Sequence, residues 1–156
     1  MEDRNSPEAI AARAAQPDPI VMYLVVKETL GMSTGKTAAQ CAHASQMALI
    51  QYLEHVCSHS GIFQYLNKWF GSLLGRTPDE PRMEIFRKWL NTSFRKVVLR
   101  ADDKEWQKVK DACPNHVVVV DAGLTEIAAG SETVIGIWPM YRSEAPKMIK
   151  KLQVLK

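Results

Sequence analysis

The sequence predicts an α/β fold of three layers, α/β/α, in which helices cover both faces of a four-stranded mixed sheet. Apolar segments at 20–26, 96–100, 116–120 and 133–138 predict the strands, and the first and third of them are typical of strands buried on both faces. Helical segments separate the first three strands, so right-handed crossovers are expected to make strands one to three parallel. A chain of 156 residues is long enough to bury a core as one domain.

The domain is expected to begin after a polar arm and to carry one insertion. Residues 1–18 lack apolar periodicity, which predicts a disordered arm ahead of a single domain over 19–156. Glycines and a proline surround an aromatic-rich piece near 57–80, which is typical of an insertion between elements of the fold.

Helical periodicity begins at Thr37, directly after the first strand and its turn. The small residues Ala38 and Ala42 lie on one stripe with later leucines, so the start of this helix is expected to pack closely against the sheet. A further helix at 83–90 is expected to follow the insertion.

The second half of the chain predicts two helices and the direction of the last strand. Asp102 or Asp103 is expected to cap a helix that ends before the third strand. The link over 122–132 contains two glycines and no helical stripe, so it is a poor crossover, and the fourth strand is expected to run antiparallel. A last helix is expected over 146–152.

Composition and charge restrict the classes of protein. No apolar run approaches the ~20 residues that a membrane span needs. Glu2, Asp3 and Glu8 argue against export or organelle import, and three cysteines indicate reduced thiols, so a cytoplasmic location without a membrane is expected. The net charge of +3 is a mild bias, but cations cluster over 82–100 and 147–156, which suits a polyanionic partner as well as solvated helix faces.

Lys36 is the most informative residue, because it lies in the first turn of a helix, where the helix dipole disfavours a cation. Lys36 follows strand one and Asp121 follows strand three, so both are expected at the carboxyl edge of the sheet, where open α/β sheets place their sites. An antiparallel fourth strand begins at that edge with Thr133, and Thr125 lies in the preceding loop. One lysine, one aspartate and two hydroxyls are therefore expected to converge.

Two other catalytic interpretations of this segment are disfavoured. Residues 31–37 resemble a phosphate-binding loop, but Gly31 comes one residue too late for that motif, which argues against nucleotide hydrolysis. Cys41 and His43 lie about 200° apart around the helix, so they cannot act together as nucleophile and base. His43 is expected to pack within the fold, with hydrogen bonding near Lys36 as the alternative.

Two further sets of residues invite a functional interpretation. The two histidines and the cysteine within 55–59 match no compact zinc spacing, so no metal site is expected there. The aromatic residues Trp69, Phe70 and Trp89 could stack on nucleic-acid bases, but packing in the core is the more common role of such residues.

Three segments carry a resemblance to a known family. GKTAAQCAHA (35–44), DAGLTEIA (121–128) and TV (133–134) resemble the type II peptidyl-tRNA hydrolase family in order and spacing, within a similarity over 20–55 and 94–156. The resemblance implies the three-layer fold with a four-stranded mixed sheet. It also implies hydrolysis, without metal or cofactor, of the ester that joins a peptide to the 3′ end of tRNA.

The resemblance also implies which residues form the site. The implied catalytic residues are Lys36, Asp121, Thr125 and Thr133. Gln40, His43, Gly35 and Gly123, which lie near them in the sequence, are expected to bind the substrate. Asp121 is expected to orient or deprotonate a water, and Lys36 to offset the charge of the intermediate or to hold a phosphate. The threonines are expected to fix the water and the ester carbonyl, and the choice of general base stays open. The implied partner is the acceptor end of peptidyl-tRNA, and a homodimer is one arrangement to consider.

The sequence departs from the family pattern beside the expected site. Thr29 stands where the family usually has aspartate, Thr34 where it often has lysine, and Leu124 and Glu126 where it has arginine and glutamine. Two basic residues are lost and one acidic residue is gained. Two functions therefore stay open: a hydrolase that recycles tRNA, or a catalytically weak adaptor of the same fold that binds a protein through the aromatic insertion.

Overall fold

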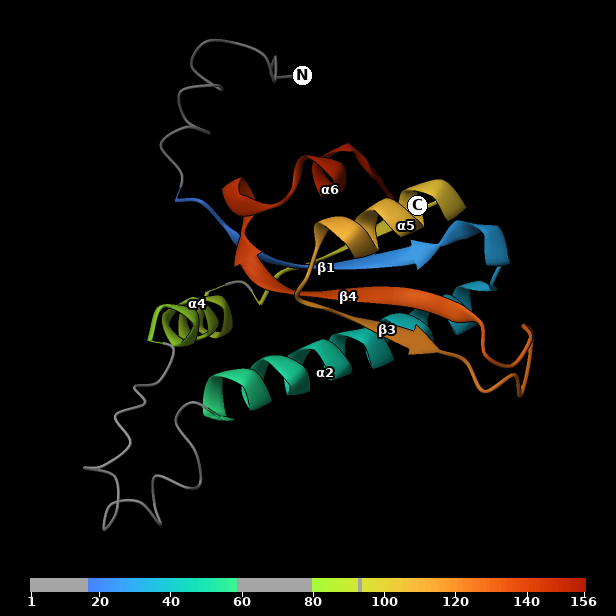
Figure 1. Cartoon of the computed structure of the whole chain (residues 1–156), viewed down its shortest axis with the longest axis horizontal. Coiled ribbons are helices and arrows are strands. Elements are labelled where there is room, and N and C mark those ends of the chain that lie inside the picture. The colour runs from blue at the N-terminus through green and yellow to red at the C-terminus, as the bar shows by residue number, and fades with distance from the viewer. Residues whose placement is uncertain (1–16, 59–79, 93) are drawn as a thin grey trace, which may run out of the picture.

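A mixed sheet of five strands runs through the middle of the protein, in the strand order β3-β4-β1-β2-β5 (Figure 1). This computed structural model describes residues 17–58, 80–92 and 94–156. The strands are β1 (Ile20–Lys27), β2 (Lys96–Ala101), β3 (His116–Val120), β4 (Glu132–Tyr141) and β5 (Gln153–Val154). The helices are α2 (Thr34–Ser58), α4 (Glu80–Asn91), α5 (Asp103–Ala112) and α6 (Lys147–Lys151), with short 3₁₀ turns η1 (Glu28–Leu30) and η2 (Arg142–Glu144).

Helices cover both faces of the sheet because its central strand β1 is apolar on both faces. The odd-numbered side chains of β1, such as Tyr23, pack in one core cluster with α5 and α6. The even-numbered ones, such as Met22, pack in a second cluster with α2 and α4. Figure 1 shows α5 and α6 above the sheet and α2 and α4 below it. The predicted α/β/α layers agree with this arrangement.

The predicted four-stranded sheet with strands one to three parallel is wrong in two respects. A fifth strand, β5, pairs antiparallel with β2 at the far edge. In the described sheet, β1–β2 is the one parallel pair, because β4 lies between β1 and β3 and pairs antiparallel with both. The loop after β3 is a hairpin connection, so β4 takes the place beside β3. The predicted antiparallel direction of the fourth strand is confirmed, and β1 and β3 still end at the same edge.

β4 continues through Pro139, where the sequence predicted its end. Tyr23 of β1 pairs with Ile137 and Val21 pairs with Met140, so two residues of β4 lie opposite one residue of β1. This is a β-bulge, one of the places where a sheet accepts proline, because no ladder hydrogen bond is needed from that nitrogen.

The buried face of α2 differs from the predicted stripe. Ala38 and Ala42 are exposed, and the buried residues of the helix recur every four positions at Gln40, Ala44, Ala48 and Tyr52. The prediction assigned the stripe from apolar residues alone. The first buried position holds a glutamine, which an apolar pattern does not detect.

Several predicted features are confirmed and others fall outside the described residues. Asp102 caps α5 in a capping box with Glu105, as the sequence predicted. Trp89 is fully buried, which confirms core packing rather than base stacking. The expected arm and insertion, with Trp69 and Phe70, lie largely outside the described residues. None of the described helices has the length and apolar character needed to cross a membrane.

Gly136 of β4 permits the close approach of α2, and its replacement tests this contact. A Cβ atom at Gly136 would lie 2.6 Å from the carbonyl oxygen of Ala44. We expect Gly136→Ala to lower the free energy of unfolding by about 1–3 kcal/mol, because overpacking forces backbone shifts. The matched control is Gly35→Ala in the first turn of α2, where the added Cβ meets nothing within 4 Å. Urea denaturation of both variants measures the difference, and equal stabilities would contradict the proposed contact.

Candidate active site

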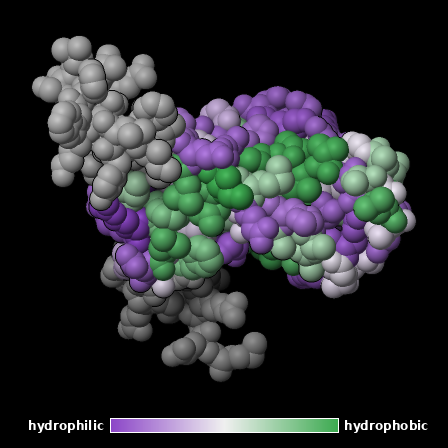
Figure 2. Space-filling model, turned by 90° about the horizontal axis from the view of Figure 1, so that it is seen from below, coloured by the Kyte–Doolittle hydropathy of each residue, from purple (hydrophilic) through white to green (hydrophobic). Residues whose placement is uncertain are grey.

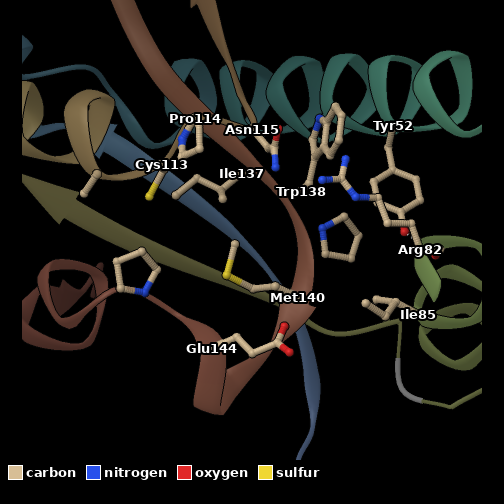
Figure 3. Close-up of a pocket in the computed structure, with 13 residues that line it drawn as sticks. Tyr52, Arg82, Ile85, Cys113, Pro114, Asn115, Ile137, Trp138, Met140 and Glu144 are labelled. Atoms are coloured by element: carbon tan, nitrogen blue, oxygen red, sulfur yellow. Dashed lines mark hydrogen bonds between the residues drawn. The ribbon is translucent and has the colours of Figure 1, made fainter. Parts of the chain in front are cut away.

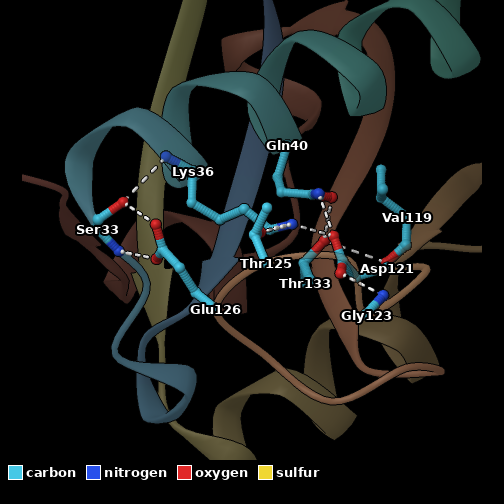
Figure 4. A network of polar contacts seen from close by, with 9 residues as sticks. All are labelled: Ser33, Lys36, Gln40, Val119, Asp121, Gly123, Thr125, Glu126 and Thr133. Atoms are coloured by element: carbon cyan, nitrogen blue, oxygen red, sulfur yellow. Dashed lines mark hydrogen bonds and ion pairs between the residues drawn. The ribbon is translucent and has the colours of Figure 1, made fainter.

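The first turn of α2 is fixed by Ser33 and Glu126. The Ser33 hydroxyl accepts from the backbone N–H of Lys36 at 3.2 Å, in the manner of an N-cap. The Glu126 carboxylate accepts from the backbone N–H of Ser33 at 2.9 Å and from its hydroxyl at 2.5 Å. These hydrogen bonds lower the pKa of Glu126, with a smaller contribution from the nearby Lys36 charge. The loop after β3 is thereby tied to the start of α2 (Figure 4).

Lys36 forms an ion pair with Asp121 at the carboxyl edge of β1 and β3. Its ammonium nitrogen lies 2.5 Å from Asp121 Oδ2, and the two side chains are 13% and 5% exposed. The same ammonium donates to Thr125 Oγ1 at 3.0 Å. The carboxylates of Asp121 and Glu126 therefore offset the cost of placing a cation at the positive end of the helix dipole.

Asp121 is held by three donors, two from α2 and one from the loop that follows β3. Besides Lys36, the Gln40 amide donates to Oδ2 at 2.7 Å, and the backbone N–H of Gly123 donates to Oδ1 at 2.8 Å. The Lys36 ammonium, and after it the Gly123 N–H, hold the pKa of Asp121 below its usual range. Asp121 is thus an ionised carboxylate at neutral pH and a weak base.

Gln40 and Thr133 extend the network into the core. Thr133 is fully buried, and its hydroxyl lies 2.8 Å from Gln40 Oε1 and 3.2 Å from the carbonyl oxygen of Val119. A carboxylate only accepts hydrogen bonds, so the amide nitrogen of Gln40 must face Asp121 and its oxygen must face Thr133. The threonine hydroxyl therefore fixes the amide that holds the carboxylate.

A groove of about 710 Å³ opens beside the ion pair, between α2 and β3. The predicted residues that line it are Lys36, Gln40, His43, Asp121 and Thr125. His43 is exposed in this groove, so the preferred prediction of a packing role for it is wrong. Ala44, the next residue of α2, is the one that packs against the sheet.

The remaining predicted residues lie at or behind the rim of the site. Thr133 lies behind Gln40. Gly123 has a φ of +74°, and a Cβ there would lie 2.5 Å from the Ala129 nitrogen, so the turn that presents its N–H to Asp121 requires glycine. Gly35 is exposed in the first turn of α2, and its substrate-binding role stays a prediction.

Ser33 and Glu126 are site residues that the sequence analysis missed as a pair. Ser33 directly precedes the helix, which is a signal for an N-cap. Their contact depends on how the loop after β3 folds back, and no local pattern predicts that. It also weakens the phosphate-loop interpretation, because the Glu126 carboxylate already occupies the N–H group of Ser33.

A smaller cavity of about 270 Å³ lies at the opposite end of the strands, where β3 begins and β4 ends (Figure 3). Tyr52, Arg82, Trp138 and Glu144 are among its lining residues, and it contains none of the predicted site residues. Within 17–58, 80–92 and 94–156, no group of three or more His, Cys, Asp and Glu residues is arranged to hold a metal ion.

The fold and the site define an α/β domain with a lysine–aspartate pair at the carboxyl edge of its strands. The family model "Peptidyl-tRNA hydrolase PTH2" matches residues 20–155, and the chain belongs to this family. It is similar to "Peptidyl-tRNA hydrolase 2" of Saccharomyces cerevisiae, with 33% identity over 138 residues, 85% of this chain and 54% of that one.

Two other relatives bracket the length of this chain. "Peptidyl-tRNA hydrolase 2, mitochondrial" of Homo sapiens is 32% identical over 123 residues, 76% of this chain and 54% of the relative. "Peptidyl-tRNA hydrolase" of Methanopyrus kandleri is 32% identical over 138 residues, 85% of this chain and 96% of the relative. The chain thus spans about half the length of the first curated relatives that it matches, and nearly all of the archaeal one.

The ionised state of Asp121 predicts how stability depends on pH. Because its pKa is lowered in the folded state, its contribution is complete above the ordinary pKa of ~4 and is lost as pH falls through the folded value. We expect the stability difference between the wild type and Asp121→Asn to be constant above about pH 5 and to shrink below about pH 4.

Urea denaturation across this range measures the difference, in which contributions from other carboxylates cancel. Asp111→Asn on α5 is the control for loss of one negative charge, since Asp111 accepts from Gln107 and forms no ion pair with any described residue. A difference that stays constant down to pH 3 would show that the Lys36 contact does not stabilise the Asp121 carboxylate.

Proposed function

We propose that this chain hydrolyses the ester between a peptide, or an N-blocked amino acid, and the 3′ end of tRNA, without a metal or a cofactor. Membership of the family supports this activity. The observation that carries it is the Lys36–Asp121 pair, which lies at the head of an open groove with Thr125 beside it. Water attacks the ester carbonyl carbon, the bond to the tRNA 3′ oxygen breaks, and a proton from the water passes to that oxygen.

Asp121 orients the attacking water in this mechanism. A carboxylate has about four lone-pair sites. Among the described residues, Oδ1 accepts from the Gly123 N–H and has room for a further donor. A lowered pKa makes Asp121 a weak base, which favours orientation of the water over its full deprotonation in the ground state.

Lys36 and Thr125 supply hydrogen-bond donors for the oxyanion. An ammonium has three protons, and the described partners of Lys36, Asp121 and Thr125, use two of them. Thr125 accepts from Lys36, so its own hydroxyl proton is available to a substrate oxygen. Two donors whose heavy atoms lie 3.0 Å apart are suited to stabilise a tetrahedral intermediate together.

Gln40 and Thr133 are positioning residues in this proposal. Gln40 donates to Asp121, and buried Thr133 fixes the orientation of the Gln40 amide. The prediction that Thr133 contacts the water or the ester is therefore replaced by an indirect role. Its hydroxyl determines where the carboxylate of Asp121 points.

The adaptor alternative has no support. Glu126, which gave it weight together with Leu124, accepts two hydrogen bonds from Ser33 and so has a structural role at the first turn of α2. The aromatic insertion that would bind a partner lies outside the described residues. A cytoplasmic location and a homodimer stay predictions.

The activity is tested with N-acetyl-aminoacyl-tRNA and purified protein in the presence of EDTA. We expect release of tRNA by the wild type, and a fall in turnover of roughly 10²–10⁴-fold for Asp121→Asn with little loss of tRNA binding. Asp111→Asn is the charge-matched control on a distant helix. Absence of turnover by the wild type would refute the hydrolase, and full activity of Asp121→Asn would refute the role of Asp121.

Lys36 is tested by separating tRNA binding from chemistry. If Lys36 stabilises the oxyanion, Lys36→Ala should raise the barrier to turnover by about 2–4 kcal/mol while the salt dependence of tRNA binding hardly changes. A lysine bound to a phosphate of the single-stranded acceptor end would instead reduce the slope of log K against log salt by about 0.7. Lys104→Ala, on the exposed surface of α5, is the control for loss of one positive charge. A changed slope with unchanged turnover would make Lys36 a binding residue only.

A further inference from the structure

The groove beside the ion pair follows the edge of a strand. It is lined by the consecutive residues Val118, Val119 and Val120 of β3. Successive side chains of a strand point to opposite faces of the sheet, so a groove that touches three residues in a row must run along the strand's edge and contact its backbone.

The backbone groups at that edge are open in the described structure. β3 is the last strand of the sheet and pairs with β4 alone. The backbone N–H of Trp138 donates to the carbonyl oxygen of Asn115, just before β3, and the N–H of Asp121, just after β3, donates to the carbonyl oxygen of Ser131. The backbone N–H and C=O groups of the odd-numbered residues of β3 therefore point toward β4. The alternation of a strand then turns the N–H and C=O of Val118 toward the open edge.

The sequence of β3 leaves this edge unprotected. Exposed edge strands usually carry a charge, a proline or a bulge that prevents pairing with another chain. His116 is followed by four valines, and the register shift against β4, where Thr133 of β4 is the extra residue, comes only at the end of β3, between Val119 and Val120. Such an edge is suited to accept an added strand, the mode in which many proteins bind extended peptides.

The opposite wall of the groove comes from α2, and its end away from Lys36 is partly apolar. Ala39 and Met47 lie on it with the polar His43 between them, and the exposed Leu124 also lines the groove. Figure 2, which views the molecule from the side of α2, shows hydrophobic residues gathered in patches on this surface. Among the residues that the structure describes, Lys36 at the head of the groove is the one lysine or arginine that lines it. The groove therefore offers few cationic groups to a polyanion, and its apolar surface suits an apolar peptide instead.

We propose that the peptide part of the substrate binds in this groove as an added strand beside β3, with its terminal ester at Lys36 and Asp121. This inference rests on the proposed function. The cleaved ester is the junction between tRNA and peptide, so both must leave the site from the same point. The apolar groove with open backbone groups begins at that point and has the size of an ordinary ligand pocket, ~300–1,000 Å³.

A pair of variants on α2 tests the groove. Met47 lines it, and Ile50, one turn further, is 55% exposed but does not line it. We compare hydrolysis of tRNA that carries N-acetyl-alanine with tRNA that carries an apolar N-acetylated pentapeptide. The wild type should prefer the pentapeptide in kcat/KM by roughly tenfold, since a few apolar contacts account for such a ratio. Met47→Gln should lose most of this preference and Ile50→Gln should keep it, with N-acetyl-alanine hydrolysed at the wild-type rate by Ile50→Gln.

Hydrogen exchange tests the added strand directly. The probe is the same pentapeptide joined by a stable amide to the 3′ end of a short CCA oligonucleotide. Binding of the probe should slow exchange of the outward Val118 amide, while the same oligonucleotide without a peptide should not.

The outcomes separate this inference from the proposed function. Equal kcat/KM for both substrates, with unchanged exchange at Val118, would overturn the groove and leave the hydrolase intact. If neither substrate is hydrolysed, the proposed function fails and the groove assignment fails with it. Protection of Val118 that rises with protein concentration in the absence of probe, together with a dimer in sedimentation, would assign the edge to a second copy of this chain instead.

Discussion

The ion pair between Lys36 and Asp121 is the contact on which the site depends. A lysine in the first turn of a helix is disfavoured by the helix dipole unless a carboxylate is close to it. Asp121 supplies that carboxylate at 2.5 Å and is itself held by Gln40 and by a backbone N–H. Buried Thr133 orients the Gln40 amide in turn. Removal of one member leaves a partly buried polar group without its partner, which costs more than the hydrogen bond alone contributes.

One topological feature produces both the polar site and the groove. β4 inserts between β1 and β3, so these two strands point the same way and end at the same edge of the sheet. The ends of β1 and β3 bring Lys36 and Asp121 together. The same insertion leaves β3 at the border of the sheet, with its outer backbone groups open. A reactive ester and the chain attached to it thus find a charged site and an apolar groove side by side.

The sequence by itself determined the layers of the fold and most of the groups at the site. Strands buried on both faces leave a long apolar run, and a capped helix leaves a local signal such as Asp102, so both can be found without tertiary information. The glycine-containing link after β3 was correctly judged too irregular for a crossover. From the strand directions alone, Lys36, Asp121 and Thr125 were expected at one edge, and the structure brings these three side chains into contact.

Only the tertiary structure decided the strand order, the face of α2 and the depth of each polar residue. β5 has two residues and carries no periodicity, and the place of β4 in the sheet depends on competition among strands for partners. Gln40 and Thr133 are buried because each satisfies the other, whereas an apolar pattern counts both as surface residues. Glu126 reaches Ser33 across 93 positions of sequence. Hydrogen bonds between distant segments have no local signature, so the final arrangement of the site was set by the folded chain.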